Sequence, residues 1–278
     1  MMLARFFGWL ARDLRAAFSL GFLLLLALLA VAAPWIAPHS PIEQNFDMIL
    51  AQAEPGYPLG TDDLGRDVLS RLIHGAAITL YASFLAVGVA VLIGVPVGLL
   101  AGYVGGWVDD VISRVIDALL SFPAIVLAIA VTGALGIGMT NAMISVGIVF
   151  SPQLARIVRA RTLVVRHELY VDAARCFGAG TGRILWRHVL PNTVQPVIVQ
   201  VTLLLAAALL AEASLSFLGL GIQPPDPSWG AMLARAYQSM EIAPAQMYPP
   251  GLAILLTALA FNTLGESLRA ALDPTMKT

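Results

Sequence analysis

Long stretches without a charged residue constrain this chain more than any other feature. A spanning helix needs about 20 mostly apolar residues, because the hydrocarbon core of a bilayer is about 30 Å thick. Five uncharged intervals reach that length: 16–42, 72–108, 118–155, 188–211 and 242–265. The chain is also 59% hydrophobic and only 12% charged, which leaves too little polar surface for a soluble domain. We predict an all-α, polytopic membrane protein.

Two of these intervals are too long to be assigned without further argument. Residues 133–141 read GALGIGMTN and lie inside the interval 118–155. Such Gly and Asn residues suit a tight turn, so we expect a helical hairpin there. The interval 72–108 has polar ends, HGAAIT and GYVGGW, and its apolar middle makes one span. The sequence therefore predicts about six transmembrane helices.

Basic residues give the orientation, because cytoplasmic loops of membrane proteins accumulate Lys and Arg. With both termini inside, thirteen basic residues are cytoplasmic and three are outside. The inner set is Arg5, Arg12, Arg15, Arg114, Arg156, Arg159, Arg161, Arg166, Arg175, Arg183, Arg187, Arg269 and Lys277, and the outer set is Arg66, Arg71 and Arg235. A cleaved secretory signal at the N-terminus is the alternative interpretation, but cleavage would break this bias. We predict an N-in, C-in topology.

Three parts follow from this topology. Residues 1–75 form a cytoplasmic segment, the first span and an outer loop. Residues 76–270 form a five-helix core with a cytoplasmic loop at about 160–191, and residues 271–278 form a cytoplasmic tail. A second outer stretch, 219–250, holds a short interfacial helix over WGAMLARAYQSM, with Trp229 and Tyr237 at headgroup depth. This helix either caps the pore or anchors it.

The first outer stretch begins irregularly and ends in YPLGTDDLGRDVLSRLIHGA. Thr61 or Asp62 can cap an amphipathic surface helix there, with acids in its first turn. Asp62, Arg66 and Asp67 are candidates for contact with a partner. The alternative is a solvated face with spaced ion pairs.

The inner loop from 156 to 192 carries seven of the sixteen basic residues. HELYVDAARCFG predicts a short helix in which Leu169, Ala173 and Phe177 share a face and Gly178 is a left-handed stop. GRILWRHVLP predicts a second short helix, after which Pro191 begins the fifth span. The two helices form either a docking knob or a passive connector that lies near anionic headgroups.

Catalytic and cofactor motifs are missing from the sequence. GAGTG at 178–182 lacks the Lys and the preceding strand of a phosphate loop, and no GxSxG is present. One Cys, scattered His residues and a net charge of -1 favour neither a metal nor nucleic acid. Glu212 and Glu266 end apolar runs, and we favour structural pairing for both over a functional role. Arg114 and Asp117 are expected to form a local pair.

DAARCFG followed by HVLP, from Asp172 to Pro191, resembles the EAA loop of ABC importer permeases. Asp172 replaces the usual Glu, and His188 stands where an aliphatic residue is commoner. LGTDDLGRDVLSRLIHGA and LSFLGLGIQPPDPSWGAML are similar, more specifically, to the second permease of dipeptide, oligopeptide and nickel importers. The resemblance implies a type I ABC importer permease fold in a bacterial cytoplasmic (inner) membrane.

The resemblance also implies partners. A homologous second permease, two ATP-binding subunits that carry ATP and Mg, and an extracytoplasmic substrate-binding protein would surround this chain in the membrane lipid. The inner loop would dock on the ATPase, through Leu169, Asp172, Ala173, Ala174, Phe177, Gly178, Leu190 and Pro191. Asp62, Arg66 and Asp67 would contact the binding protein or order the outer face.

Function follows from the same resemblance. We expect a non-enzymatic permease subunit that forms half of a pathway for di- or oligopeptides, with a nickel or other small-solute permease as the alternative. A secondary transporter is a further alternative, but such proteins carry internal repeats and ionisable residues near the bilayer midplane, and neither is evident here. A membrane-embedded enzyme would need a catalytic set that the sequence does not contain.

Overall fold

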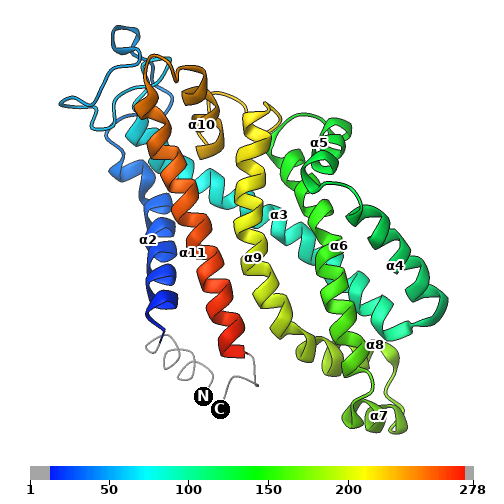
Figure 1. The fold of residues 1–278 in the computed structure, drawn as a ribbon. Helices are drawn as coiled ribbons and strands as arrows, with labels where there is room; N and C mark the ends of the chain where they lie inside the picture. The colour runs from blue at the N-terminus through cyan, green and yellow to red at the C-terminus, as the bar shows by residue number, and fades with distance from the viewer. Residues whose placement is uncertain (1–12, 273–278) are drawn as a thin grey trace.

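The computed structural model describes residues 13–272, which are mostly helical (Figure 1). Within residues 13–272, five helices are long and apolar enough to cross a membrane. They are α2 (Leu14–Ile36), α3 (Val68–Val104), α6 (Met139–Val165), α9 (Leu190–Phe217) and α11 (Tyr248–Leu272). The tail at 273–278 and the basic residues Arg5, Arg12 and Lys277 lie outside the described residues.

The sixth expected crossing is a bent pair. Helices α4 (Gly106–Leu120) and α5 (Ala124–Leu135) meet at an angle of 97°. A straight third span starting near residue 118 is therefore wrong. The break lies at Pro123, because a proline disfavours helical backbone in the residue before it. The expected hairpin turn is confirmed, since α5 and α6 are separated only by residues 136–138.

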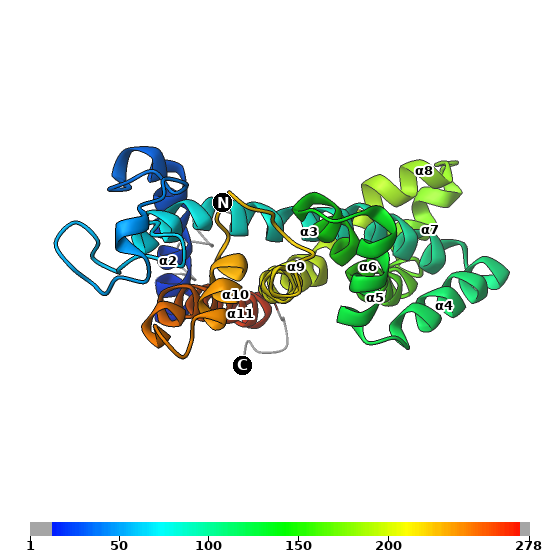
Figure 2. The same ribbon diagram turned by 90° about the horizontal axis from the view of Figure 1, so that it is seen from above.

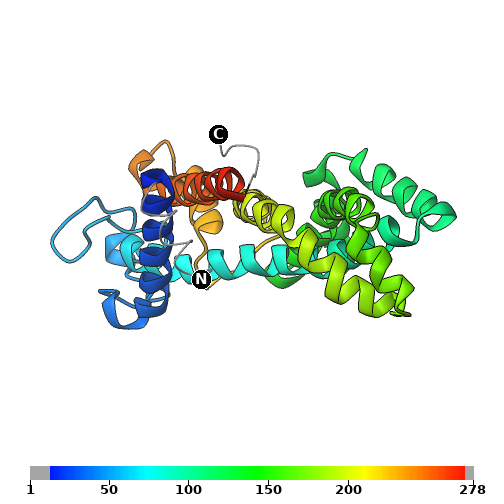
Figure 3. The same cartoon turned by 90° about the horizontal axis from the view of Figure 1, so that it is seen from below.

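Helix α3 runs through the whole molecule and organises the other helices. It packs mainly on α6, and α9 lies against α3, α6 and α11. Helix α2 covers α3 and α11. Seen from above and from below, α2 and α11 lie at one end of an elongated bundle and α4 and α5 at the other (Figures 2 and 3).

Glycines allow α3 and α6 to approach closely. Gly94, Gly98 and Gly102 recur every fourth residue on the face of α3 toward α6. A Cβ atom at Gly98 would lie 2.7 Å from Cβ of Val158, and one at Gly147 of α6 would lie 2.5 Å from Cβ of Val89. Small residues at such spacing are typical of helix contacts in membranes.

The two ends of the bundle agree with the expected sidedness. The start of α2 and the end of α11 lie at the same end of the bundle as α7 (Leu169–Cys176) in the basic inner loop (Figure 1). The outer end holds residues 37–67, helix α10 (Trp229–Gln238) and the short 3-10 helices η1 (Phe46–Met48) and η3 (Pro244–Met247).

Two expectations about the outer end need correction. No separate surface helix follows Thr61 in the described chain: residues 61–67 form a turn, and α3 begins directly at Val68. The cap is Asp67, whose carboxylate accepts hydrogen bonds from the amides of Leu69 and Ser70. Trp229, expected as an interfacial side chain, is instead only 1% exposed, because its indole packs inside the protein and donates to the Leu72 carbonyl at 2.9 Å.

Ion pairs join α4 to α6 at the inner half of the molecule. Asp117 pairs with Arg156 of α6 rather than with Arg114, so the expected local pair is wrong. Asp109 binds Arg159 through both oxygens, one at 2.7 Å from Nη2. A bidentate pair of this kind fixes orientation as well as distance, and it ties α4 to the bundle core.

Candidate functional site

The inner loop forms a compact knob in which α7 has two different faces. Val171 is fully buried and Ala174 packs against the core of the loop. On the other face, Leu169 is 86% exposed and Phe177 is 91% exposed. Exposed apolar side chains of this size on one short helix indicate a contact surface rather than a solvated connector.

The backbone of α7 ends as its sequence predicts. Gly178 has φ +77, and its amide donates to the Arg175 carbonyl at 2.9 Å. The Ala179 amide donates to the Ala174 carbonyl at 3.0 Å. These two bonds form a Schellman motif, in which glycine is favoured because it has no Cβ. The motif sets the position of Phe177 at the tip of the knob.

The second short helix differs from the prediction. Helix α8 (Thr181–Ile184) leads into a π-helical turn, η2 (Leu185–Val189), which continues without a break into α9. Pro191 lies in the first turn of α9, as expected, but the two short helices and α9 run on as one continuous helix. The missing amide of proline removes one helical hydrogen bond, and the wide π turn just before it accommodates that loss.

The other predicted docking residues are distributed over both faces. Asp172 and Ala173 are exposed beside Leu169, whereas Ala174 faces inward. Leu190 is half-buried and Pro191 is exposed at the root of the knob. Leu169, Asp172, Ala173 and Phe177 are thus exposed on α7 or at its end, whereas Ala174 and Leu190 pack against the core.

Contacts that the sequence did not indicate hold the knob against the end of α3. The Arg175 guanidinium lies 5.4 Å from the centre of the Tyr103 ring and 3.0 Å from an Asp172 oxygen. A hydrogen bond with Tyr103 raises the pKa of Arg175. Arg166 donates to the Gly102 carbonyl at 2.9 Å. Only the proximity of the chain segments in space reveals these partners, because Tyr103 has no sequence signal that links it to the loop.

Gly178→Ala should loosen the end of α7. An alanine in the left-handed conformation costs about 1 kcal/mol. A Cβ at Gly178 would meet no neighbour, so backbone strain is the only destabilising effect of this substitution. We expect amide hydrogen exchange in α7 to accelerate about fivefold. Gly182→Ala is the matched control, because that glycine also has open space but lies in α8 without a positive φ. Equal exchange in the two variants would contradict this account.

On the outer side, the predicted charged residues are largely buried. Arg66 and Asp67 are each 1% exposed. The Asp62 carboxylate accepts from the Leu64 and Arg66 amides at 3.0 Å, and it lies 2.7 Å from Arg66 Nη2 and 3.4 Å from Arg71 Nε. This network closes the 61–67 turn. Its burial supports the role of ordering the outer face and leaves Arg66 and Asp67 little surface to offer a partner.

The three outer basic residues converge in space. Arg66, Arg71 and Arg235 all line a pocket of about 170 Å³ beside α10. Arg235 of α10 binds Asp63 at 2.8 Å, and Arg71 donates to the Pro41 carbonyl at 2.6 Å. The outer segment, α3 and α10 are therefore joined into one unit.

Glu212 lies where α9 meets α10 and is 1% exposed. It accepts a hydrogen bond from Ser216 at 2.8 Å, and a Cβ at Gly230 of α10 would lie 3.0 Å from its second oxygen. That second oxygen has no hydrogen-bond partner among residues 13–272, and no ion pair is seen there, so the expected structural pairing of Glu212 is limited to Ser216. Glu266, in contrast, is exposed. Over residues 13–272, no three His, Cys, Asp or Glu side chains gather as a metal site would require.

Comparison with known proteins decides the family. Residues 94–278 match the family of binding-protein-dependent transport system inner membrane components, and residues 4–55 match the N-terminal transmembrane domain of oligopeptide transport permease C. The chain belongs to this family of permeases. The permease is therefore a multi-pass protein of the inner membrane, and the family expected from the inner loop and the outer motifs is confirmed.

Relatives and solved structures agree with this assignment. The permease is 42% identical over 99% of its length to the di/tripeptide transport system permease protein DppC of Pseudomonas aeruginosa, of which the match covers 93%. It is 48% identical over 92% of its length to the glutathione transport system permease protein GsiD of Shigella flexneri, of which the match covers 85%. A solved structure of the inward-facing MetNI methionine ABC transporter matches with a TM-score of 0.57 at 19% identity, over 73% of this permease and 97% of that chain. This structural match supports the type I fold.

Proposed function

We propose that the permease forms half of the transmembrane pathway of an ATP-driven peptide importer and is coupled to a separate ATPase through α7. The exposed apolar face of α7, with Leu169 and Phe177, carries the proposal. That face has no partner within residues 13–272, and its backbone is set by the Gly178 turn. A groove on an ATP-binding subunit is the expected partner, because the chain itself has no phosphate-binding loop.

Coupling would work through the docked helix. When two ATP-binding subunits close on ATP and Mg, α7 would move with them, and α6 and α9 would follow. Access to the pathway would then switch between the two sides of the membrane, which is coupling between distant sites through a two-state element. A homologous second permease would complete the pathway, and a substrate-binding protein would deliver cargo at the outer end.

A bulky residue in the middle of the docking face tests the coupling. Ala173 is exposed between Leu169 and Phe177, so Ala173→Trp should obstruct docking without disturbing the membrane bundle. We expect uptake by the complete importer and peptide-stimulated ATP hydrolysis to fall at least tenfold, the effect of about 1.4 kcal/mol. Ala173→Ser, which keeps a small side chain, should stay near normal.

The amount of permease in the membrane is the control for folding and should be unchanged in both variants. Normal uptake and normal stimulated ATP hydrolysis in Ala173→Trp would refute the docking assignment. Uptake driven by an ion gradient in liposomes that contain the permease alone would favour the secondary transporter instead.

Peptides are the proposed cargo because the two relatives are named for di/tripeptides and for glutathione. Uptake of labelled dipeptides, tripeptides and Ni²⁺ by the reconstituted importer with its binding protein separates the alternatives. We expect uptake of labelled peptide, and an excess of unlabelled peptide should suppress it. Transport of Ni²⁺ without peptide transport would overturn this part of the proposal.

A further inference from the structure

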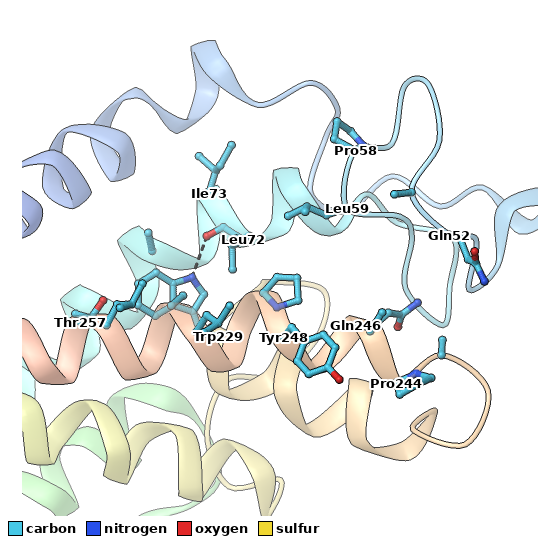
Figure 4. Close-up of a pocket in the computed structure, with 18 of the residues that line it drawn as sticks. Gln52, Pro58, Leu59, Leu72, Ile73, Trp229, Pro244, Gln246, Tyr248 and Thr257 are labelled. Carbon is cyan, nitrogen blue, oxygen red and sulfur yellow. Dashed lines mark hydrogen bonds between the residues drawn. The ribbon is translucent and has the colours of Figure 1, made fainter.

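A large cavity lies in the outer half of the molecule and is distinct from the inner loop. It has a volume of about 910 Å³ and is lined by α2, α3, α10, α11 and the outer segment (Figure 4). Its walls include Phe22 and Leu26 of α2, Leu72 of α3, Trp229 of α10, and Leu252 and Leu256 of α11. It therefore lies between spanning helices rather than in the aqueous loops alone.

The chemistry of the walls is almost entirely apolar. None of the residues that line the cavity is Asp, Glu, Lys, Arg or His. The Trp229 indole nitrogen is already satisfied by the Leu72 carbonyl, so Trp229 presents only its ring to the cavity. Apolar cavities of this kind are poor sites for water, which needs two to four polar partners. The matching occupant is uncharged and apolar.

The length and the depth of the cavity fit one leaflet. Tyr248 begins α11 near the mouth, and Thr257 lies at the opposite end of the cavity (Figure 4). They are nine positions apart along the helix, a rise of about 14 Å, and one leaflet of a hydrocarbon core is about 15 Å thick. Thr257 is fully buried, and its hydroxyl has no hydrogen-bond partner among residues 13–272.

The cavity is also open at its side along α11. Leu252 and Leu256 line it and are 52% and 48% exposed, on a helix that crosses the membrane. At the outer mouth, the Gln52 amide and the Tyr248 hydroxyl are available beside the apolar walls (Figure 4). An unfilled space of this size would forfeit dispersion contacts over all of its walls, and the surrounding solvent at this depth is lipid.

We propose that this cavity binds an acyl chain of a phospholipid from the outer leaflet of the membrane. The chain enters past Leu252 and Leu256 and reaches Thr257, while Gln52 and Tyr248 donate to its ester carbonyls. The site selects for the chain rather than for headgroup charge, because the lining carries no cation. The lipid fills the space between α2 and α11 and supports the outer end of both helices.

Photolabelling with a lipid analogue shows which residues the acyl chain contacts. The complete importer is placed in nanodiscs with a phosphatidylethanolamine that carries a diazirine at the end of one acyl chain. We expect the label on buried wall residues, Trp229, Leu26 and Ala76, which are 1%, 9% and 2% exposed. Moving the diazirine next to the ester should shift the label toward Tyr248 and Leu59. Labels confined to exposed residues outside the cavity, such as Leu255 and Leu259, would overturn the proposal.

A variant that fills the cavity provides a second test of lipid binding. Ala253→Trp places an indole in the cavity and should reduce labelling of Trp229 and Leu26 several-fold. Ala27→Trp is the matched control, because Ala27 is exposed on α2 and does not line the cavity. Unchanged labelling in Ala253→Trp, or loss of the wild-type label on addition of excess peptide, would overturn the assignment to lipid. If Ala253→Trp does not assemble, the wild-type importer still tests the proposal, because the labelled residues should change with the position of the diazirine on the acyl chain.

Discussion

Asp62→Ala is expected to lower the stability of the permease by about 3–5 kcal/mol, the range found when one partner of a buried ion pair is removed. The side chains of Arg66 and Arg71 are only 2% and 3% exposed, and both lie against the Asp62 carboxylate. Alanine would leave two buried guanidinium groups without this anion. It would also remove the acceptor for the Leu64 and Arg66 amides that closes the turn before α3.

The apparent melting temperature of the detergent-solubilised importer measures this effect. A loss of several kcal/mol corresponds to a decrease on the order of 10 °C. Asp117→Ala is the control: it removes an ion pair outside the docking face whose side chains are 66% and 55% exposed, and such pairs contribute about 0–1 kcal/mol. If both variants melted at the same temperature, the ion pairs of Asp62 would have no special structural role.

Gly98→Leu is expected to disrupt the contact between α3 and α6 and to prevent stable folding. The new side chain would start 2.7 Å from Cβ of Val158 and 3.0 Å from the Arg159 amide nitrogen. Neither neighbour can withdraw easily, since both belong to the backbone or Cβ of a long packed helix. Overpacking costs about 1–3 kcal/mol and occasionally more, and a leucine against a helix backbone belongs at the upper end.

Gly88→Leu is the matched control on the same helix. Gly88 is exposed, and a Cβ there would meet nothing within 4 Å. We expect Gly88→Leu to accumulate in the membrane and to purify with its partners, whereas Gly98→Leu should be degraded or aggregate on extraction. Immunoblots of membranes and size-exclusion profiles in detergent measure both. Normal yield of Gly98→Leu would show that α3 and α6 are not held by this close approach.

Features encoded by local pattern could be predicted from the sequence. Charge-free length identified the spans, and the Gly-rich stretch at 133–141 contained the turn at 136–138. Helix α7 and its stop at Gly178 follow from apolar spacing and from the conformational freedom of glycine. Each of these depends on residues within one or two helical turns of each other, so no knowledge of tertiary structure was needed.

Features that depend on distant segments could not be predicted. Asp62 and Arg66 have the spacing of a helix pair, yet they lie in a turn that folds over α3 and buries them. Asp117 pairs across 39 positions with Arg156 instead of with its neighbour. Trp229 resembles an interfacial residue in sequence, but its indole is satisfied by a carbonyl 157 positions away. In each case the partner lies beyond the reach of sequence periodicity.

The connections on either side of α7 leave the knob almost no slack. Only residues 166–168 separate α6 from α7, a tether of about 10 Å at full extension. On the other side, residues 177–180 join α7 to α8, and α8, η2 and α9 then continue as one helix. Arg166 and Arg175 also bind the end of α3, at Gly102 and Tyr103. A pull on α7 therefore passes through connections of only three and four residues and loads three spanning helices together.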